Sequence, residues 1–314
     1  MKIVAGIDVS KGTLDIRHKG KSLVASNDPS GFRRVAKFCQ GADWVVMEAT
    51  GSYHAALALY LHAKGFQVAV LNPARPAYYA RSMGKRNKTD QVDAQTLVEF
   101  GQTHELEAFA PPTERELLLC RLVRLRADLV EQRAQVKGRM KDPAQTSFEC
   151  EMLQKQYQFF KEQIGLVEKK ITALIQAEPV FLQAYELLTG ISGIGPVTAW
   201  TWMAEMRDIG RFESAKKVGA FIGLCPSLRH SGTSVNGPGK LSRQGNATLR
   251  KALYLAALAA IREDNLFQAF YIRLLQKGKP NKTAIVAVMH KLARVAYAVL
   301  KSGIPFKPER ALTN

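Results

Sequence analysis

The chain has 314 residues, enough for two or three domains with a sizeable hydrophobic core. Its 45 Lys and Arg residues outnumber its 27 Asp and Glu residues, which gives a net charge of +18 and a pI near 9.8. This excess of positive charge favours a polyanionic partner, nucleic acid before a membrane surface. The sequence opens directly into a strand-like segment and shows no signal peptide and no apolar run of membrane-spanning length. We therefore expect a cytoplasmic protein without a membrane partner.

The cysteines carry no metal-ligand spacing. Cys39, Cys120, Cys150 and Cys225 are scattered along the chain. This distribution favours buried thiols in a reducing compartment over a disulfide framework or a zinc site.

The first third of the chain alternates between strand-like and helix-like segments. Short β-branched or alternating runs predict strands, and longer amphipathic runs predict helices. Alternation of this kind is typical of an α/β sheet. The predicted strands are 2–9, 14–16, 22–25, 44–48 and 66–71, and the predicted helices are 31–40 and 56–64.

Four acidic side chains follow these elements in a pattern that indicates metal chemistry. Asp8 and Glu48 lie at the ends of two predicted strands that can be neighbours, and Asp90 and Asp93 share one face of a helix that follows. Four acids brought together would repel one another unless a divalent cation neutralised them. Each acid also has a simpler interpretation, a turn residue for Asp8 and Glu48 or a helix cap for the Asp pair.

A basic cluster precedes the Asp90–Asp93 pair. Arg81, Lys85, Arg86 and Lys88 have no acidic residue between them. Cations that can hold phosphate beside carboxylates that can hold a metal ion suggest metal-assisted phosphodiester chemistry.

After Pro111 the pattern becomes that of long helices. Residues 113–138 carry Leu118, Leu122, Leu125, Leu129 and Val136 at nearly heptad spacing, and residues 149–176 form a second amphipathic stretch. We expect an antiparallel coiled-coil hairpin that serves dimerisation or spacing. Its Arg and Lys residues can line nucleic acid, although a solvated face is the commoner explanation.

A third region begins near Glu178 and is mostly helical. Residues 187–199 have the form of a helix, a glycine-rich turn with Gly193 and Gly195, and a second helix. This pattern is that of a helix-hairpin-helix, whose turn offers backbone N–H groups to phosphate. A hairpin that only packs is the alternative. Further helices are predicted at 212–222, 248–261 and 283–300.

Residues 226–246 form the least structured stretch by pattern. They hold four glycines, four serines and no acid, and they carry Arg229, Lys240 and Arg243. Glycine and serine beside cations let the backbone approach phosphate and expose a hydroxyl as a nucleophile. A flexible solvated loop is the alternative.

Taken in order, these motifs resemble the IS110/IS1111 family of insertion-sequence transposases, which is related to the Piv DNA invertases. The resemblance covers nearly the whole chain. Single motifs are weak, but their order and spacing are specific. They are Gly6-Ile7-Asp8-Val9-Ser10-Lys11, Met47-Glu48-Ala49-Thr50-Gly51-Ser52-Tyr53, Asn72-Pro73, Lys88-Thr89-Asp90-x-x-Asp93-Ala94, Gly193-Ile194-Gly195-Pro196, Ser231-Gly232 and Leu241-Ser242-Arg243-x-Gly245-Asn246.

The resemblance implies an RNase H-like (RuvC-like) α/β domain at 1–110 with a D-E-D-D site for Mg²⁺ at Asp8, Glu48, Asp90 and Asp93. It implies a coiled-coil region at 111–178 and a mostly helical transposase domain at 179–314. The resemblance further implies that a serine of that last domain attacks DNA and forms a transient phosphoserine link. Ser231 is the first choice, and Ser234 and Ser227 are rivals.

The implied partners are donor and target DNA, a guide (bridge) RNA, and further copies of the chain in dimers that join into tetramers. The implied setting is the bacterial cytoplasm, in association with the nucleoid. We assign nucleic-acid contacts to the glycines and cations of the motifs above: Lys11, Arg81, Lys85, Arg86, Lys88, Gly193, Gly195, Arg229, Lys240 and Arg243.

Alternative functions remain open from the residues alone. The sequence does not separate a transposase from a Piv-like invertase of similar sequence, and a RuvC-like nuclease or resolvase needs the four acids but no serine. The Gly6–Ser10 segment also resembles the first phosphate loop of sugar kinases, although no second convincing nucleotide loop follows. A non-catalytic nucleic-acid-binding protein on the same fold is the fourth possibility.

Overall fold

The structure is a computed structural model that describes residues 2–49, 51, 53–84, 90–231, 235–241 and 245–308. For residues 90–92, 226–231 and 235–241 it describes the backbone only. The chain divides into two compact units, residues 1–111 and 112–314. The further boundary predicted at 178/179 stays a prediction.

The first unit is built on a mixed sheet of five strands in the order β3-β2-β1-β4-β5. The antiparallel part is β1 (Val4–Val9), β2 (Thr13–His18) and β3 (Lys21–Ser26), and the parallel part adds β4 (Trp44–Glu48) and β5 (Val68–Leu71). The predicted α/β class is confirmed, and the prediction for 44–48 matches β4 in both bounds.

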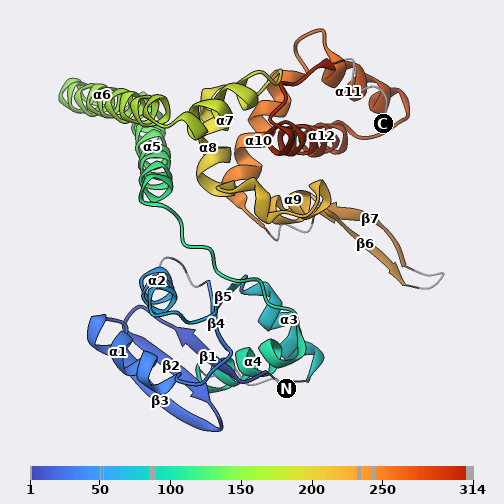
Figure 1. Ribbon diagram of the computed structural model, residues 1–314. Coiled ribbons are helices and arrows are strands. Elements are labelled where there is room, and N and C mark those ends of the chain that lie inside the picture. Colours follow the sequence, from blue (N-terminus) through green and yellow to red (C-terminus); the bar gives the residue numbers. More distant parts are fainter. Residues whose placement is uncertain are drawn as a thin grey trace. The chain divides into compact units, whose positions relative to one another are not determined.

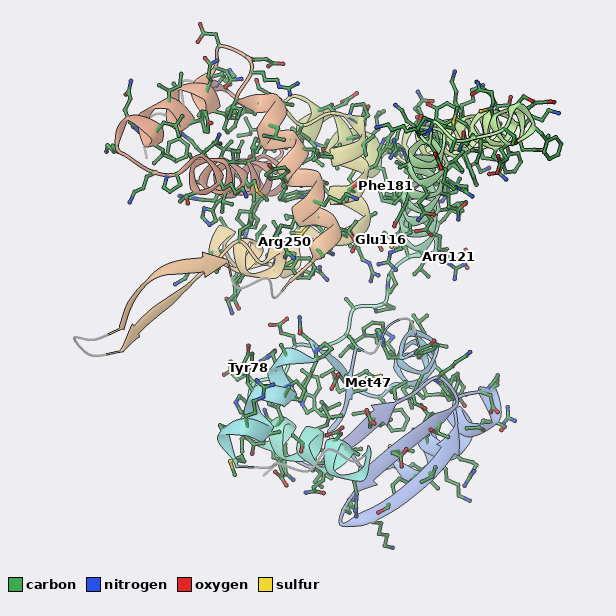
Figure 2. All side chains as sticks on the ribbon, turned by 180° about the vertical axis from the view of Figure 1, so that it is seen from behind. Met47, Tyr78, Glu116, Arg121, Phe181 and Arg250 are labelled. Atoms are coloured by element: carbon green, nitrogen blue, oxygen red, sulfur yellow. The ribbon has the colours of Figure 1, made fainter. Side chains whose placement is uncertain are left out.

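Helices cover both faces of this sheet (Figure 1). On one face, α1 (Pro29–Phe38) and α2 (Ala55–Ala63) bury Phe32, Val35 and Leu57 against alternate residues of the strands. Met47, labelled in Figure 2, belongs to this core. On the opposite face, α3 (Ala74–Ser82) and α4 (Asp90–Thr103) form a separate core with Val4 and Val46.

The second unit begins with two long helices, α5 (Glu114–Arg139) and α6 (Ser147–Ala177). Each starts with a capping box, formed by Thr113 with Glu116 and by Thr146 with Glu149. Arg126 pairs with Glu168 at 2.7 Å, and Arg133 lies over the ring of Tyr157 at 5.9 Å, so the two helices run antiparallel.

The predicted apolar seam of α5 is confirmed at Val136, which is 1% exposed, and Leu122 packs against the core, but two of its five positions are wrong. Leu118 and Leu125 are 40% and 46% exposed, whereas Leu119, Cys120 and Val123 are buried. The inward face is set by contacts with α8 as well as α6, and these contacts cannot be read from heptad spacing. The hairpin is confirmed as a pair of helices, and a supercoil stays a prediction.

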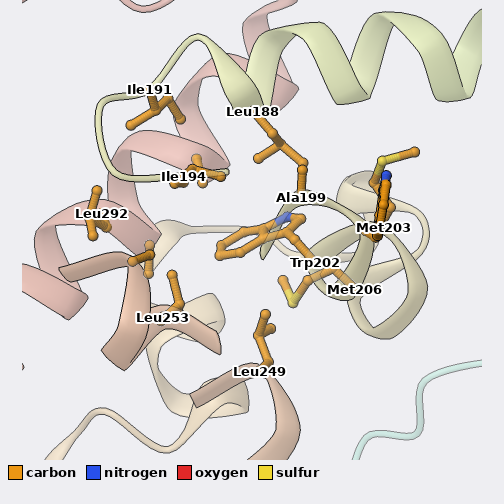
Figure 3. Close-up of a cluster of buried hydrophobic side chains, with 14 of the residues drawn as sticks. Leu188, Ile191, Ile194, Ala199, Trp202, Met203, Met206, Leu249, Leu253 and Leu292 are labelled. Carbon is orange, nitrogen blue, oxygen red and sulfur yellow. The ribbon is translucent and has the colours of Figure 1, made fainter. Parts of the chain in front are cut away.

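The base of this hairpin shares one core with the helices that follow. Leu119 and Ile171 lie in the same cluster as Trp202, which is 1% exposed. Figure 3 shows Trp202 among the side chains of Ile194 and Leu253. The helices around this core are α7 (Pro179–Thr189), α8 (Pro196–Met206), α9 (Ala215–Ile222), α10 (Ala247–Ala260), α11 (Leu266–Gln276) and α12 (Asn281–Ser302), with a short 3₁₀ turn, η1 (Ile209–Arg211).

Helix α12 is the one described helix that is long and apolar enough to cross a membrane. The expectation that no segment reaches this length was therefore wrong. Half of its most apolar stretch is buried, and the helix lies against α7, α9, α10 and α11. Its apolar character is explained by its place in the core.

The stretch predicted to be least structured contains a β-ribbon. Strands β6 (Pro226–Ser231) and β7 (Val235–Leu241) pair antiparallel, and Figure 1 shows them extending beyond α9. The register shifts between Ser227 and Arg229, where β7 contributes an extra residue near Pro238. A bulge lets a strand accept a proline, which has no N–H for the ladder. Backbone pairing, rather than side-chain propensity, decides this segment.

All four cysteines are free, as expected. Cys39 and Cys120 are buried, and burial raises the pKa of the Cys39 thiol to about 12. The expectation of burial was wrong for Cys150, which is exposed.

Candidate functional site

The position of the acidic residues depends on how α4 lies on the sheet. A Cβ added to Gly6 of β1 would lie 2.3 Å from the carbonyl oxygen of Ala94 and 2.9 Å from the backbone nitrogen of Val98. A Cβ added to Gly101 would lie 2.9 Å from Val4 Cγ1. Helix and strand therefore meet backbone to backbone, and only glycine permits this approach.

These contacts show which strand residues face α4. Val4 and Val46 belong to the core beneath α4, and Gly6 faces the helix directly. Successive strand residues point to opposite faces, so residues two apart share a face. Asp8 therefore projects on the same side as Gly6, and Glu48 on the same side as Val46.

Asp8 and Glu48 are also neighbours along the sheet edge. The parallel ladder between β1 and β4 pairs Ile7 with Met47, so the next residue of each strand lies at the same level. Both acids are partly buried. Two carboxylates thus sit at the carboxyl ends of adjacent parallel strands, on the α4 side.

The first turn of α4 lies at the level of these two acids. Val4 contacts Gly101, and Asp8 lies four residues further along β1, roughly 13 Å away at about 3.3 Å per residue. At about 1.5 Å per residue, the same distance along α4 leads back to residue 92 or its neighbours. The α4 turn from Asp90 to Asp93 is therefore level with the end of β1.

The donor chemistry of this region suits a hard divalent cation, because carboxylate oxygens are the ligands that Mg²⁺ prefers. Among the side chains that the structure describes, no group of three or more His, Cys, Asp or Glu residues is arranged to hold a metal ion. The side chain of Asp90 lies outside the described residues. Asp8, Glu48 and Asp93 each have an interaction partner within the protein.

Two residues of β2 share this face and were missed by sequence reasoning. Asp15 pairs with Asp8, and Arg17 pairs with Gly6. Residues directly opposite in a ladder project to the same face. The Nε of Arg17 is buried without a hydrogen-bond partner among the described residues. The alternation of Leu14 and Ile16 with Asp15 and Arg17 was the signal that could have found them.

The predicted basic contacts of the first unit are only partly described. Lys11 is exposed in the turn between β1 and β2, and Arg81 is exposed on α3 with its guanidinium 6.0 Å from the ring centroid of Tyr78. Figure 2 labels Tyr78 on this unit. Lys85, Arg86 and Lys88 lie outside the described residues.

The glycine-rich turn between α7 and α8 has a packing explanation. Gly193 has a φ of +89°, and a Cβ there would lie 2.5 Å from Ala260 Cβ and 2.6 Å from the Ala256 carbonyl oxygen. Close approach to α10 thus requires glycine at this position. Gly195 is exposed and precedes α8 without a side-chain cap. A nucleic-acid contact at either glycine stays a prediction.

The ribbon separates the candidate serines. Ser231 is the last residue of β6 and pairs with Val235 at the far end, whereas Ser227 pairs with Lys240 near the base, roughly 13 Å away by strand geometry. Arg229 pairs with Gly237 between them. Ser234 and Arg243 lie outside the described residues, as do the side chains of Arg229, Ser231 and Lys240.

Gly245 and Asn246, the last two residues of the Leu241–Asn246 motif, hold the base of the ribbon. A Cβ on Gly245, whose φ is +139°, would lie 2.6 Å from the Gly223 nitrogen. Asn246 caps α10 by accepting from the Leu249 N–H at 2.9 Å. These two residues join the end of the ribbon segment to α9 and α10.

A carboxylate on α8 completes this junction. Glu205 accepts a 2.6 Å hydrogen bond from the Asn246 side chain and pairs with Arg124 of α5 at 3.3 Å. Its side chain is 10% exposed, which makes the interaction less screened than a surface pair. Arg250, labelled in Figure 2, donates to the Ile222 carbonyl oxygen at 2.9 Å. Sequence reasoning missed Glu205, since an isolated acid in an apolar helix carries no motif.

Two family models match the chain. A model described as a transposase, of the DEDD type named for IS110, matches residues 5–149. A second, described as the transposase IS116/IS110/IS902 family, matches residues 185–272. The first therefore covers the sheet with its acids, and the second covers the glycine-rich turn and the ribbon.

Curated relatives extend over the same range. The pilin gene-inverting proteins of Moraxella bovis and Moraxella lacunata are each 29% identical over 316 positions, covering 97% of this chain and 98% of theirs. A transposase for the insertion sequence element IS1328 of Yersinia enterocolitica is 25% identical and covers 83% of this chain and 85% of its own length. By these matches the chain is similar to IS110-type insertion-sequence transposases over both units and to the pilin gene-inverting proteins over nearly its whole length.

Proposed function

We propose that the chain cuts and rejoins DNA with a serine nucleophile and a divalent metal ion, Mg²⁺, held by Asp8, Glu48, Asp90 and Asp93. The proposal rests on the close contact between the backbone of α4 and Gly6. This contact aligns the first turn of α4 with the strand ends that carry Asp8 and Glu48. Transposases and DNA invertases cleave and rejoin DNA, and the family models support this class of activity.

The proposed roles follow from the chemistry of each group. A bound divalent ion would stabilise the negative charge that develops on a phosphodiester in the transition state. The carboxylates of Asp8, Glu48, Asp90 and Asp93 would hold that ion. The hydroxyl oxygen of Ser231 would form a phosphoester with one DNA strand, and the strand end that leaves would take up a proton as a free hydroxyl.

The proposal includes a guide (bridge) RNA, and dimers that join into tetramers, in association with the nucleoid. These parts come from the resemblance, and the net charge of +18 is compatible with binding both DNA and RNA. The coiled-coil character of the α5–α6 hairpin and the helix-hairpin-helix role of the α7–α8 turn belong to the same proposal.

Site-specific DNA inversion is the second candidate, and the relatives favour it. The two Moraxella proteins, which are named for inverting a pilin gene, match 97% of this chain. Inversion and transposition share strand cleavage and rejoining, so the proposed residue roles hold for both.

A trapped covalent adduct tests the serine mechanism. The full-length protein is incubated with Mg²⁺ and with labelled DNA that carries the gene's own flanking sequence, then denatured and separated by electrophoresis. We expect a labelled protein band that Ser231→Ala removes and that Ser227→Ala, at the ribbon's base, retains. Cleavage without any adduct would instead identify a nuclease that uses metal and water alone. An adduct that persists in Ser231→Ala would move the nucleophile to another serine, with Ser234 the next to test.

A further inference from the structure

The last two helices of the second unit form a region without acidic residues. Residues 265–308 contain eight Lys and Arg residues and no Asp or Glu. The segment includes α11 and α12, which pack against each other, and most of its cations lie outside the core. A stretch of this length that carries only positive charge repels itself unless something outside it supplies negative charge.

Two of these cations share one aromatic ring. The guanidinium carbon of Arg273 on α11 lies 5.4 Å from the Phe270 ring centroid, and the Lys291 nitrogen on α12 lies 4.9 Å from it. Phe270 and Lys291 are partly buried, and Arg273 is exposed. A ring within 6 Å holds a cation by its negative face, so one ring holds cationic groups from two neighbouring helices.

A third cation completes the cluster. Arg294 lies one helical turn after Lys291 on α12 and is exposed. Burial lowers the pKa of Lys291, and the neighbouring charges of Arg273 and Arg294 lower it further. Burial and the charge of Arg294 likewise lower the pKa of His290, which favours the neutral ring. We call Phe270, Arg273, Lys291 and Arg294 the basic–aromatic cluster.

Three arginines elsewhere in the second unit differ from the cluster because they have acidic partners. Arg115, Arg124 and Arg126 of α5 each pair with a glutamate. Within the described part of the chain, no carboxylate pairs with Arg273, Lys291 or Arg294. Three cations therefore converge without an internal counter-charge, although bringing like charges together has a free-energy cost.

We propose that the basic–aromatic cluster binds the phosphate backbone of duplex DNA, through residues other than the four acids and the ribbon. Three cations on two adjacent helices can each contact a phosphate, and the Phe270 ring keeps two of them in place. The proposed action on DNA makes duplex DNA the occupant, so the inference rests on that function. It adds a binding surface that the function does not require.

Equilibrium binding tests the proposal. Binding of the full-length protein to a fluorescein-labelled duplex of 30 base pairs is followed by fluorescence anisotropy in EDTA at several salt concentrations. The test variant carries Arg273→Gln, Lys291→Gln and Arg294→Gln. We expect its dissociation constant to rise at least about tenfold at 0.1 M salt, and the slope of log K against log salt to fall by about 3 because each lost phosphate contact lowers it by about 0.9.

Two control variants make the result specific. Lys161→Gln, Lys169→Gln and Lys170→Gln remove the same charge from exposed positions of α6, and we expect a loss of less than about threefold. Arg273→Lys, Lys291→Arg and Arg294→Lys keep the charge, and we expect binding within about twofold of the natural chain. Equal losses in the α6 control, or losses in the charge-keeping variant as large as those in the glutamine variant, would overturn the proposal.

Two further readouts keep this test separate from that of the proposed function. A single-stranded RNA of 30 nucleotides replaces the duplex in one arm, and a larger loss there than on DNA would overturn the assignment to duplex DNA. Cleavage cannot occur in EDTA if it needs a metal ion, so a failed adduct experiment leaves this result unaffected.

Discussion

The acidic face of the first unit and the ribbon of the second unit hold their candidate residues in opposite ways. Asp8 and Glu48 lie on adjacent strands in the middle of a five-stranded sheet, with helices on both faces. Ser231 lies at the far end of a two-stranded sheet whose strands pair chiefly with each other. The acids are fixed by many neighbours, whereas the serine is fixed mainly through the base of the ribbon.

This difference shows which supporting contacts outside the candidate catalytic residues should affect activity when they are mutated. In the first unit, the critical contact is the backbone approach of α4 at Gly6, directly beside the acids. In the second, it is the junction of Glu205, Asn246 and Gly245, at the opposite end of the ribbon from Ser231. The comparison predicts direct effects on the acidic face and effects transmitted through the ribbon on the serine.

The largest effect is expected from Asp8→Asn. Loss of a carboxylate from the proposed metal site should lower DNA strand cleavage by more than about 100-fold, since even outer-shell changes at metal sites cost about 10- to 100-fold. Binding to DNA should stay within about threefold, because the basic surfaces are unchanged. Cleavage of flanking DNA and anisotropy measure the two quantities.

Two further acids serve as controls for Asp8→Asn. Glu105→Gln removes an exposed acid of the same unit and should leave cleavage unchanged. Asp15→Asn removes the acid opposite Asp8 and should cost less than about tenfold, because the family resemblance gives it no ligand role. A variant Asp8→Asn that cleaves as fast as the natural chain would remove the metal assignment.

Gly6→Ala should destabilise the first unit by about 1–3 kcal/mol, because the added Cβ must push α4 off the sheet. Cleavage should fall with it, since α4 carries Asp90 and Asp93. Gly12→Ala is the matched control, as a Cβ at Gly12 meets no atom within 4 Å. Urea unfolding measures both variants, and equal stability in the two would contradict the close contact.

Glu205→Ala should lower the free energy of unfolding by about 1–3 kcal/mol, because it leaves the amide of Asn246 and the guanidinium of Arg124 without this partner. It should also lower the yield of covalent adduct while leaving metal-ion binding intact. Glu151→Ala breaks the exposed pair with Lys155 and should cost less than about 1 kcal/mol. A Glu205→Ala variant as stable as Glu151→Ala would show that the junction is not what holds the ribbon.

The smallest effect concerns acid stability. Asp28 caps α1, and hydrogen bonds from the Gly31 N–H and then from Ser30 lower its pKa from 3.8 to about 2. Because the folded pKa lies below the unfolded value, the carboxylate stabilises the fold fully above pH 3.8, and this contribution disappears as the pH falls through about 2. Asp28→Asn keeps a capping oxygen but no charge. The natural chain should therefore have the higher melting temperature at pH 6, and the difference should vanish near pH 2.

Elements with a dense local signal were predictable from the sequence. The run 44–48 is short, apolar and bounded, and it forms β4 at those residues. The long helices were also found, because apolar residues at helical spacing mark 113–138 and 149–176, which correspond to α5 and α6. The expectation that Asp8 and Glu48 end neighbouring strands matches the ladder between β1 and β4.

Features that depend on tertiary contact were not predictable. Heptad spacing named Leu118 and Leu125, but contacts with α6 and α8 bury Leu119 and Val123 instead. Strands were not predicted for the ribbon, because Gly237-Pro238-Gly239 has low strand propensity. Its ladder and bulge depend instead on the backbone pairing of β6 with β7. The need for glycine at positions 6 and 193 is visible only once α4 and α10 are in place.

The central claim is that the α4 face of the sheet binds a divalent ion through Asp8, Glu48 and the first turn of α4. Electron paramagnetic resonance of Mn²⁺ added to the full-length protein measures this directly. We predict bound Mn²⁺ in the natural chain and its loss in the variant Asp8→Asn/Glu48→Gln, with the melting temperature unchanged or raised. Equal Mn²⁺ binding by the two proteins would contradict the claim.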